Sequence, residues 1–168
     1  VVEPKLTTQW FIKMKPLAKK ALKEMDKITF KPPESKSILQ YWLNNIEDWC
    51  ISRQLVWGHK MPVWFNKSSD WVIADTESEA RTKFIDDQKN SEEVFQSTDV
   101  LDTWFSSALI PILVEDLPTG PMITGSDILF FWVGRMIMMT LYIENQLPFT
   151  FVYNHGLIRD KIGRKMSK

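Results

Sequence analysis

Cysteine is nearly absent from this sequence, which contains only Cys50 among its 168 residues. A single cysteine excludes an internal disulfide and a cysteine-rich zinc site, and it fits a reducing compartment. Net charge is absent as well, because 21 Lys and Arg side chains balance 21 Asp and Glu side chains. No whole-molecule field therefore attracts nucleic acid, so an RNA partner would have to meet a local basic patch or a neighbouring domain.

A secretory leader and an uninterrupted membrane-spanning run are also missing from the sequence. Residues 1–5 carry neither a basic lead nor an apolar run, so nothing there is typical of a signal peptide. The longest apolar stretch, residues 128–143, is interrupted by Gly134 and Arg135 and is shorter than the roughly 20 residues that cross a bilayer. We therefore expect a buried helix there, no membrane partner, and a cytoplasmic location, with an organelle as the alternative.

An initiator Met is absent, and the sequence stops at Lys168 inside a basic segment. Both observations lead us to expect a piece of a longer protein. The remaining composition, with 44% hydrophobic and 25% charged residues, is typical of a globular domain that can bury a core. Aromatic residues are numerous, with eight Trp and ten Phe, and most of them are expected in that core.

Strand-like and helix-like segments alternate along the chain. The expected strands cover residues 9–14, 28–30, 62–65, 71–74, 122–124 and 149–153, of which the third and fourth form a hairpin. The expected helices begin at Pro16, at the capping-box sequences Ser37–Gln40 and Thr76–Glu79, at Asp102–Thr103, and near Asp127. Residues 86–98 are polar without clear periodicity and are predicted to form a mobile surface loop. The pattern predicts an α/β fold with some parallel strand pairing.

The segment Thr124-Gly125-Ser126-Asp127 joins an expected strand to the long apolar helix. Glycine allows a sharp turn and a close approach of a ligand, while the helix start offers free N–H groups and a carboxylate for a ribose. The alternative is that Ser126 or Asp127 only caps the helix, and this segment alone does not decide between the two.

The C-terminal segment from Gly163 to Lys168 is basic and led by a glycine. Lysines on such a loop can close over a triphosphate and neutralise the charge that develops during nucleotidyl transfer. The alternative is a solvated basic tail, which is what most charge runs are.

Two tryptophan-bearing segments could together form a small apolar pocket for an amino-acid side chain. The turn at Trp57 and Gly58 presents one ring, and the helix start after Asp99 places Val100 and Trp104 on one face. Ordinary core packing is the alternative. Cys50 is expected to be a buried small hydrophobe rather than a nucleophile, and His59 a hydrogen-bonded structural residue, while His155 is only a candidate.

Taken in order, these segments resemble the class I aminoacyl-tRNA synthetases, and within that class the enzymes for branched aliphatic amino acids. Residues 165–168, Lys-Met-Ser-Lys, match the start of the KMSKS signature of the class. Residues 49–62, WCISRQLVWGHKMP, are similar to the valine-specific sequence WCISRQLWWGHRIP. Residues 102–107, residues 125–132 and the opening residues 4–11 also look valine-specific.

The resemblance implies the second half of a Rossmann-like nucleotide-binding fold, with a connecting segment that returns from an editing insertion. Residues 1–36 would be that return segment, and residues 37–168 the C-terminal half of the catalytic domain. The implied activity is ATP-dependent activation of valine and its transfer to tRNA(Val), with Mg²⁺ arriving with ATP and no metal site on the protein.

The same resemblance assigns site residues by motif position. Those of the valine pocket are Trp57, Asp99, Val100 and Trp104. Those of the ATP site are Gly125, Asp127, Lys165 and Lys168, of which the two lysines stabilise the reacting phosphates. Catalysis would rest on positioning and electrostatics, without a covalent enzyme intermediate.

The sequence departs from the family pattern in several places. It contains no HIGH tetrapeptide, which belongs to the first half of the fold, so we expect these residues alone to be inactive. Val56, Ile110 and Ser126 stand where aromatic residues are common, and the segment 111–118 is shorter than in relatives. The alternative function is therefore a degenerate stand-alone binding module without catalysis.

Overall fold

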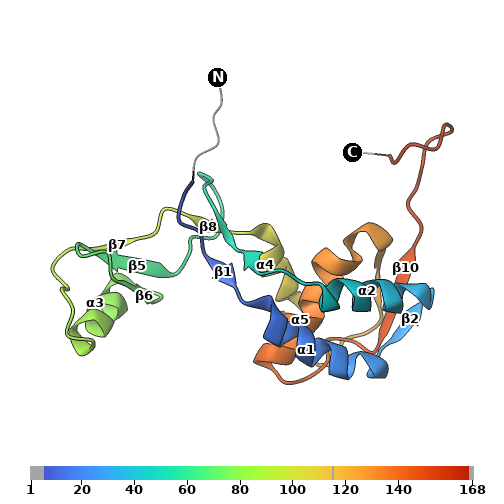
Figure 1. Ribbon diagram of the computed structural model, residues 1–168, viewed down its shortest axis with the longest axis horizontal. Helices are drawn as coiled ribbons and strands as arrows, with labels where there is room; N and C mark the ends of the chain where they lie inside the picture. Colours follow the sequence, from blue (N-terminus) through green and yellow to red (C-terminus); the bar gives the residue numbers. More distant parts are fainter. Residues whose placement is uncertain (1–5, 115, 167–168) are drawn as a thin grey trace. The chain divides into compact units, whose positions relative to one another are not determined.

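The computed structural model of the chain describes residues 6–114 and 116–166. It divides into two compact units, each built from two separate stretches of sequence. The first unit comprises Val1–Trp10 and Cys50–Thr103, and the second comprises Phe11–Trp49 and Trp104–Lys168. Figure 1 shows the elements of both units along the chain.

The first unit contains a three-stranded antiparallel sheet with the order β6-β5-β7, formed by β5 (Val63–Asn66), β6 (Trp71–Ile73) and β7 (Val94–Gln96). Helix α3 (Glu77–Asp86) covers one face (Figure 1), and Phe84 of this helix is fully buried beside Val72. The predicted hairpin is confirmed. So is the capping box, because the Thr76 hydroxyl accepts from the Glu79 N–H at 3.2 Å.

Strand β7 lies inside the segment that was predicted to be a loop, so that prediction is wrong for residues 94–96. The strand is three residues long and pairs Val94 with Asn66 and Phe95 with Phe65. This edge strand has only three residues, which is too short a run to show a strand periodicity in the sequence.

A second, shorter ribbon of the first unit pairs β4 (Ser52–Arg53) with β8 (Val100–Leu101) in antiparallel fashion. The chain then enters α4 (Thr103–Ala108), directly after the buried Asp102, so the predicted helix start is confirmed.

The second unit is built on a parallel sheet with the order β2-β10-β9, formed by β2 (Thr29–Lys31), β10 (Phe151–His155) and β9 (Met122–Gly125). Both neighbours of β10 run parallel to it, which confirms the predicted parallel pairing and the α/β class. Shorter elements of this part of the chain are β1 (Phe11–Ile12), β3 (Trp49–Cys50, at the boundary of the two units), η1 (Met25–Lys27) and η2 (Ile110–Leu113).

Helices α1 (Met14–Glu24) and α2 (Glu34–Asn44) bury apolar stripes, and α2 begins three residues before the predicted Ser37 start. The expected strand 9–14 is shorter than predicted, because α1 already begins at Met14. The Asp48 carboxylate fixes that start by accepting from the Met14 N–H at 3.0 Å.

The apolar stretch forms one helical path through η3 (Ser126–Ile128), the π-helical η4 (Leu129–Gly134) and α5 (Arg135–Ile143). Its 18-residue window has a mean hydropathy of 1.4, so by length and composition alone it could cross a membrane. However, 56% of that window is buried inside the protein, and Ile137 and Met138 are fully covered. The prediction of a buried core helix is confirmed.

Candidate active site

The predicted nucleotide corner lies where the parallel strands β9 and β10 end together, since Gly125 is paired with His155. Ligands of open parallel sheets bind outside this carboxyl edge. A Cβ on Gly125 would lie 2.7 Å from Asp127 Oδ1, so a side chain at this position would displace the carboxylate. Glycine at this position therefore leaves the Asp127 carboxylate where it lies in the structure.

The Asp127 carboxylate faces the lysine that the KMSKS resemblance predicts to bind phosphates. Lys165 Nζ lies 2.5 Å from Asp127 Oδ2, and both side chains remain partly open to solvent. The Lys165 ammonium, through this hydrogen bond, holds the pKa of the Asp127 carboxyl below its usual range, and His155 adds a smaller effect in the same direction. The structure thus brings together Gly125, Asp127 and Lys165, whereas Lys168 lies outside the described residues.

A turn that the sequence analysis did not single out holds Lys165 in this position. The Asp160 carboxylate accepts from the Ile162 and Arg164 N–H groups at 3.0 and 2.9 Å and pairs with Arg164 Nε at 2.8 Å. Gly163 takes a left-handed φ of 81°, which closes the turn. The Arg164 hydrogen bonds also hold the pKa of Asp160 below its usual range. The sequence signal for this turn is Asp160 followed three residues later by Gly163, because aspartate and glycine are both common in turns.

In the first unit, Val100 lies between two flanking segments. It pairs with Arg53 in the β4–β8 ribbon and forms a bridge with Lys60 on its other side. The loop between these segments carries Trp57, whose side chain is 90% exposed, and Gly58, whose φ is 151°. A Cβ on Gly58 would lie 3.0 Å from Val100 Cγ2, so the loop passes directly over the side chain of Val100.

Asp99, the neighbour of Val100, contacts Gln54, which in turn contacts Gln9. Gln54 Nε2 donates to Asp99 Oδ2 at 3.1 Å and to Gln9 Oε1 at the same distance. Asp99 also lines an open cleft of about 490 Å³ together with the aromatic rings of Trp10 and Trp71. The structure therefore brings Asp99, Val100 and the Trp57 loop into one region of the first unit.

Trp104, the fourth predicted pocket residue, belongs to the second unit. Its ring stacks on Phe131, with 6.1 Å between centroids and an interplanar angle of 27°. Phe131 is 46% exposed, so this aromatic pair is accessible from solvent. The pocket of four residues remains a prediction, because its members are divided between the two units.

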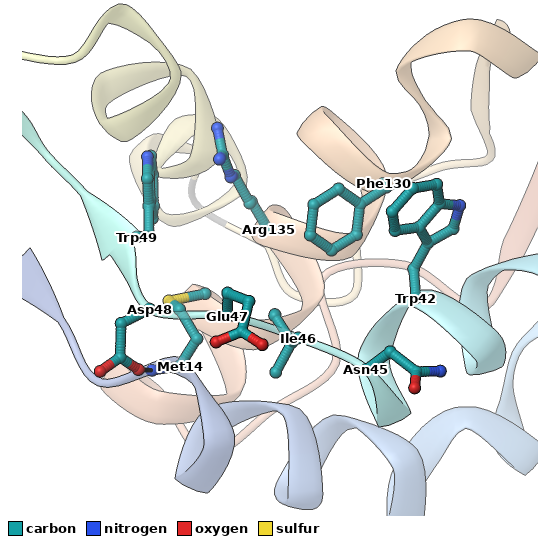
Figure 2. Close-up of a pocket in the computed structure, with 9 residues that line it drawn as sticks. All are labelled: Met14, Trp42, Asn45, Ile46, Glu47, Asp48, Trp49, Phe130 and Arg135. Carbon is teal, nitrogen blue, oxygen red and sulfur yellow. Dashed lines mark hydrogen bonds between the residues drawn. The ribbon is translucent and has the colours of Figure 1, made fainter.

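A cavity of about 250 Å³ lies near the aromatic residues of the second unit. Figure 2 shows Trp42 and Phe130 together at one side, with rings stacked 5.4 Å apart, and Trp49 beside Arg135 at the other. The Arg135 guanidinium carbon lies 3.8 Å from the centre of the Trp49 ring, which is a cation–π contact. The sequence analysis assigned no role to Arg135, because a charge in an apolar run reveals its partner only after folding.

Metal ligands do not cluster in the part of the chain that is described. Within residues 6–114 and 116–166, no group of three or more His, Cys, Asp or Glu side chains is placed to hold a metal ion.

Curated relatives match the whole chain. It is 45% identical to the Arabidopsis thaliana valine–tRNA ligase named chloroplastic/mitochondrial 2, over an alignment of 186 residues that covers 100% of this chain and 19% of the relative. The Borreliella burgdorferi and Bdellovibrio bacteriovorus valine–tRNA ligases are 46% and 48% identical over 182 residues, which cover 100% of this chain and 20% of each relative. The chain thus spans about a fifth of these relatives' length. The aligned lengths exceed its 168 residues, so the relatives carry residues without a counterpart here.

Solved structures show the same fold at low sequence identity. A ternary complex of Agrobacterium radiobacter K84 agnB2 LeuRS with tRNA and LeuAMS has a TM-score of 0.58 at 16% identity, covering 79% of this chain and 23% of that one. Mycobacterium tuberculosis methionyl-tRNA synthetase, bound by methionyl-adenylate, has a TM-score of 0.59 at 15% identity, covering 95% and 28%. These likenesses confirm the Rossmann-like α/β class. Because the profile of the tRNA synthetases of class I (I, L, M and V) matches residues 1–168, the chain belongs to that family.

Proposed function

We propose that this chain is part of a valine–tRNA ligase, in which it supplies one side of the ATP site and much of the valine site. The observation that carries the proposal is the meeting of Gly125, Asp127 and Lys165 at the carboxyl edge of parallel strands. The identity of 45–48% to valine–tRNA ligases supports the choice of valine over the other amino acids of the family.

In the proposed ATP site, Asp127 accepts hydrogen bonds from the ribose hydroxyls, and Gly125 keeps the corner open. Lys165, together with Lys168, stabilises the phosphates as the valine carboxylate attacks and pyrophosphate leaves. A ribose hydroxyl on Asp127 would replace the ammonium that now binds there, which frees Lys165 to reach a phosphate. The flexible stem of lysine suits this movement. Mg²⁺ would be held by the phosphate oxygens.

In the proposed valine site, the side chains of Trp57, Val100 and Trp104 surround the two methyl groups of valine, and Asp99 lies beside them. Such a pocket excludes isoleucine by size but rejects threonine only weakly, because threonine has nearly the same volume. The complete enzyme would therefore need editing, and its editing site lies outside this chain. Residues 1–36 are proposed to return from that insertion, and residues 37–168 to form the catalytic half-domain.

The wider context of the proposal is protein synthesis. The valyl group would pass from valyl-adenylate to the terminal ribose of tRNA(Val), and tRNA would meet the chain together with parts of the ligase not present here. The low cysteine content fits the reducing cytoplasm or an organelle with similar conditions.

Valine-dependent exchange of pyrophosphate into ATP tests this function. The 168-residue chain alone should show no exchange, because the half of the fold that carries the HIGH-type motif is missing. The same chain joined to that half should exchange with valine and much less with isoleucine. Exchange by the chain alone would refute the need for a second half. A joined protein that exchanges with isoleucine, leucine or methionine but not with valine would refute the valine assignment.

A further inference from the structure

Val100 is held in place by the chain segments on its two sides. The Leu101 N–H donates to His59 O at 2.7 Å, and the Met61 N–H donates to Asp99 O at 3.1 Å. On the opposite side, Arg53 is the strand partner of Val100. The loop 54–58 therefore leaves one side of Val100 and returns on the other, carrying Trp57 with it.

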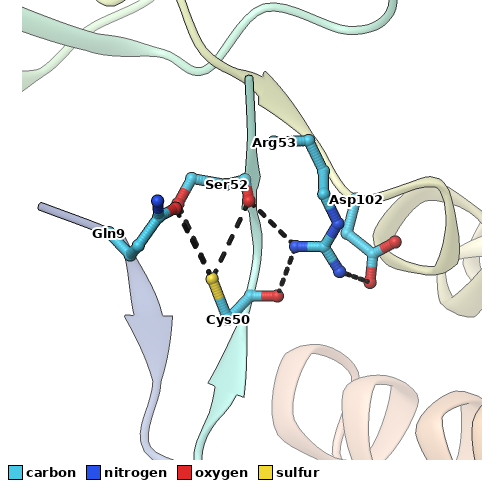
Figure 3. A network of polar contacts seen from close by, with 5 residues as sticks. All are labelled: Gln9, Cys50, Ser52, Arg53 and Asp102. Carbon is cyan, nitrogen blue, oxygen red and sulfur yellow. Dashed lines mark hydrogen bonds and ion pairs between the residues drawn. The ribbon is translucent and has the colours of Figure 1, made fainter. Parts of the chain in front are cut away.

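The Arg53 side chain locks the first end of this loop (Figure 3). Its Nη1 atom donates to Cys50 O at 2.9 Å and to Ser52 O at 2.8 Å. Its Nη2 atom lies 3.2 Å from Asp102 Oδ2. One guanidinium thus joins two carbonyls of its own segment to the carboxylate that follows β8.

Asp102 makes this contact unusually sensitive to substitution, because its side chain is only 8% exposed. The Asp102 N–H also donates to Ile51 O at 2.7 Å, so backbone and side chain hold the same two segments together. Removing Arg53, whose own side chain is 39% exposed, takes a cation away from the covered Asp102 carboxylate, and a shift of the structure would then expose that carboxylate. Here such a shift would move β8, and with it Val100.

We propose that Arg53 and Asp102 are a positioning pair that sets the shape of the valine site, by fixing Val100 beneath the loop that carries Trp57. This inference rests on the proposed function. Neither side chain is assigned a contact with substrate. The pair acts through the strand register, whereas the proposed ATP residues Gly125, Asp127 and Lys165 belong to the other unit.

Arginine is needed at this position for a geometric reason. The planar guanidinium offers several N–H groups in fixed directions, so it can reach two carbonyls and a carboxylate at once. The single ammonium of a lysine keeps the charge but cannot span these three acceptors with the same geometry. A substitution that preserves charge is therefore expected to fail.

The test uses a complete ligase that contains this chain, with valine-dependent pyrophosphate exchange as the readout. Arg53→Gln and Arg53→Lys should each raise the KM for valine about tenfold, the effect of one lost charge-assisted contact. The KM for ATP should differ from that of the unsubstituted ligase by no more than about twofold, because the pair is proposed to act on the valine site alone. Asp102→Asn, which keeps an acceptor oxygen for Arg53, should cause a smaller rise.

A matched control is Arg81→Gln, which breaks the 2.7 Å ion pair with Glu77 on α3 of the same unit. This variant should leave both KM values unchanged. Thermal unfolding is measured for every variant, and if Arg53→Gln does not fold, Arg53→Lys and Asp102→Asn decide by the same criterion.

Three results would overturn the positioning role: an unchanged valine KM in the folded Arg53 variants, an equal rise in both KM values, or full activity of Arg53→Lys. Failure of the proposed function looks different, because the unsubstituted ligase would then show no valine-dependent exchange at all.

Discussion

Two buried asparagines show how strongly a polar side chain depends on its partners. Asn66, which is 1% exposed, donates to Asp70 Oδ2 and Asn90 O and accepts from the Ser68 and Asp70 N–H groups. Asn154 on β10 is 6% exposed, but its amide nitrogen and oxygen have no hydrogen-bond partner among the described residues. The same residue type thus stabilises the first unit through its hydrogen bonds and destabilises the second, where its amide lacks them.

Replacing each asparagine by leucine should change stability in opposite directions. Asn154→Leu should raise the free energy of unfolding by about 1–3 kcal/mol. The substitution removes two buried polar groups that lose their hydration on folding and gain no hydrogen bond in return. Asn66→Leu should lower it by at least about 2 kcal/mol, since it leaves backbone N–H groups without acceptors. Urea unfolding followed by circular dichroism measures both. A destabilised Asn154→Leu variant would show that the amide is satisfied by water.

At the same scale, candidate residues that belong to a recognisable local motif could be proposed from the sequence, whereas residues that act through distant contacts could not. Gly125 and Asp127 were recognised because a glycine and a carboxylate at a strand–helix junction form a local motif. Arg53 and Asp102 were quoted only as parts of motifs, since the contact between them joins residues 49 positions apart. Asp160 was missed for a different reason, because it acts on the backbone of its own turn.

At the scale of elements, α3 and the sheet beneath it depend on one aromatic side chain. Phe84 is fully buried against Val72 and Ala80, while its neighbour Ile85 is 61% exposed. Phe84→Ala should destabilise the first unit by about 3–5 kcal/mol, because it leaves a cavity that a small sheet cannot fill by collapse.

The matched control for this prediction is Ile85→Ala, which should change stability by no more than about 0.5 kcal/mol. Hydrogen exchange resolved by mass spectrometry would locate the loss in residues 63–96. A uniform loss over both units would contradict the separate core that the first unit shows.

The ion pair between Lys165 and Asp127 of η3 predicts a defined pH response. Because Lys165 lowers the pKa of Asp127 in the folded protein, the ion pair contributes stability above the ordinary aspartate pKa of 3.8. That contribution is lost as the pH falls through the lowered folded value. A carboxyl titration by NMR should give Asp127 a pKa below 3.8. In Lys165→Met it should move up towards that value, whereas Lys161→Met should leave it unchanged. An unchanged Asp127 pKa in Lys165→Met would show that the two side chains do not pair in solution.

Elements with their own periodicity or turn chemistry were predicted well, and those held by partners were not. The hairpin, the Thr76 cap, the parallel strands and the apolar helix all follow from local patterns. Strand β7 exists because β5 offers it an edge, and α2 begins at Glu34 before the capping sequence. For β7 a tertiary contact overrides the local sequence signal, and for α2 an extra helical turn does so.

At the scale of the whole molecule, the two units divide the proposed chemistry. The first holds Trp57, Asp99 and Val100, and the second holds Trp104 and the proposed ATP residues. Substitutions of the proposed valine residues and of the proposed ATP residues should affect different kinetic constants of a complete ligase. Trp57→Ala would remove the apolar contact that we propose for this residue with the amino acid, so it should raise the KM for valine about tenfold, the equivalent of about 1.4 kcal/mol.

Lys165→Ala should act on the reaction step instead. A lysine that stabilises charge developing on the phosphates contributes mainly in the transition state, so the kcat for exchange should fall by about a hundredfold or more. The KM for valine should stay near that of the unsubstituted enzyme, and Lys161→Ala should change neither constant. If Lys165→Ala raised the valine KM while kcat held, Lys165 would belong to substrate binding rather than to phosphate stabilisation. The similarity of residues 165–168 to the KMSKS signature would then not imply phosphate stabilisation by Lys165.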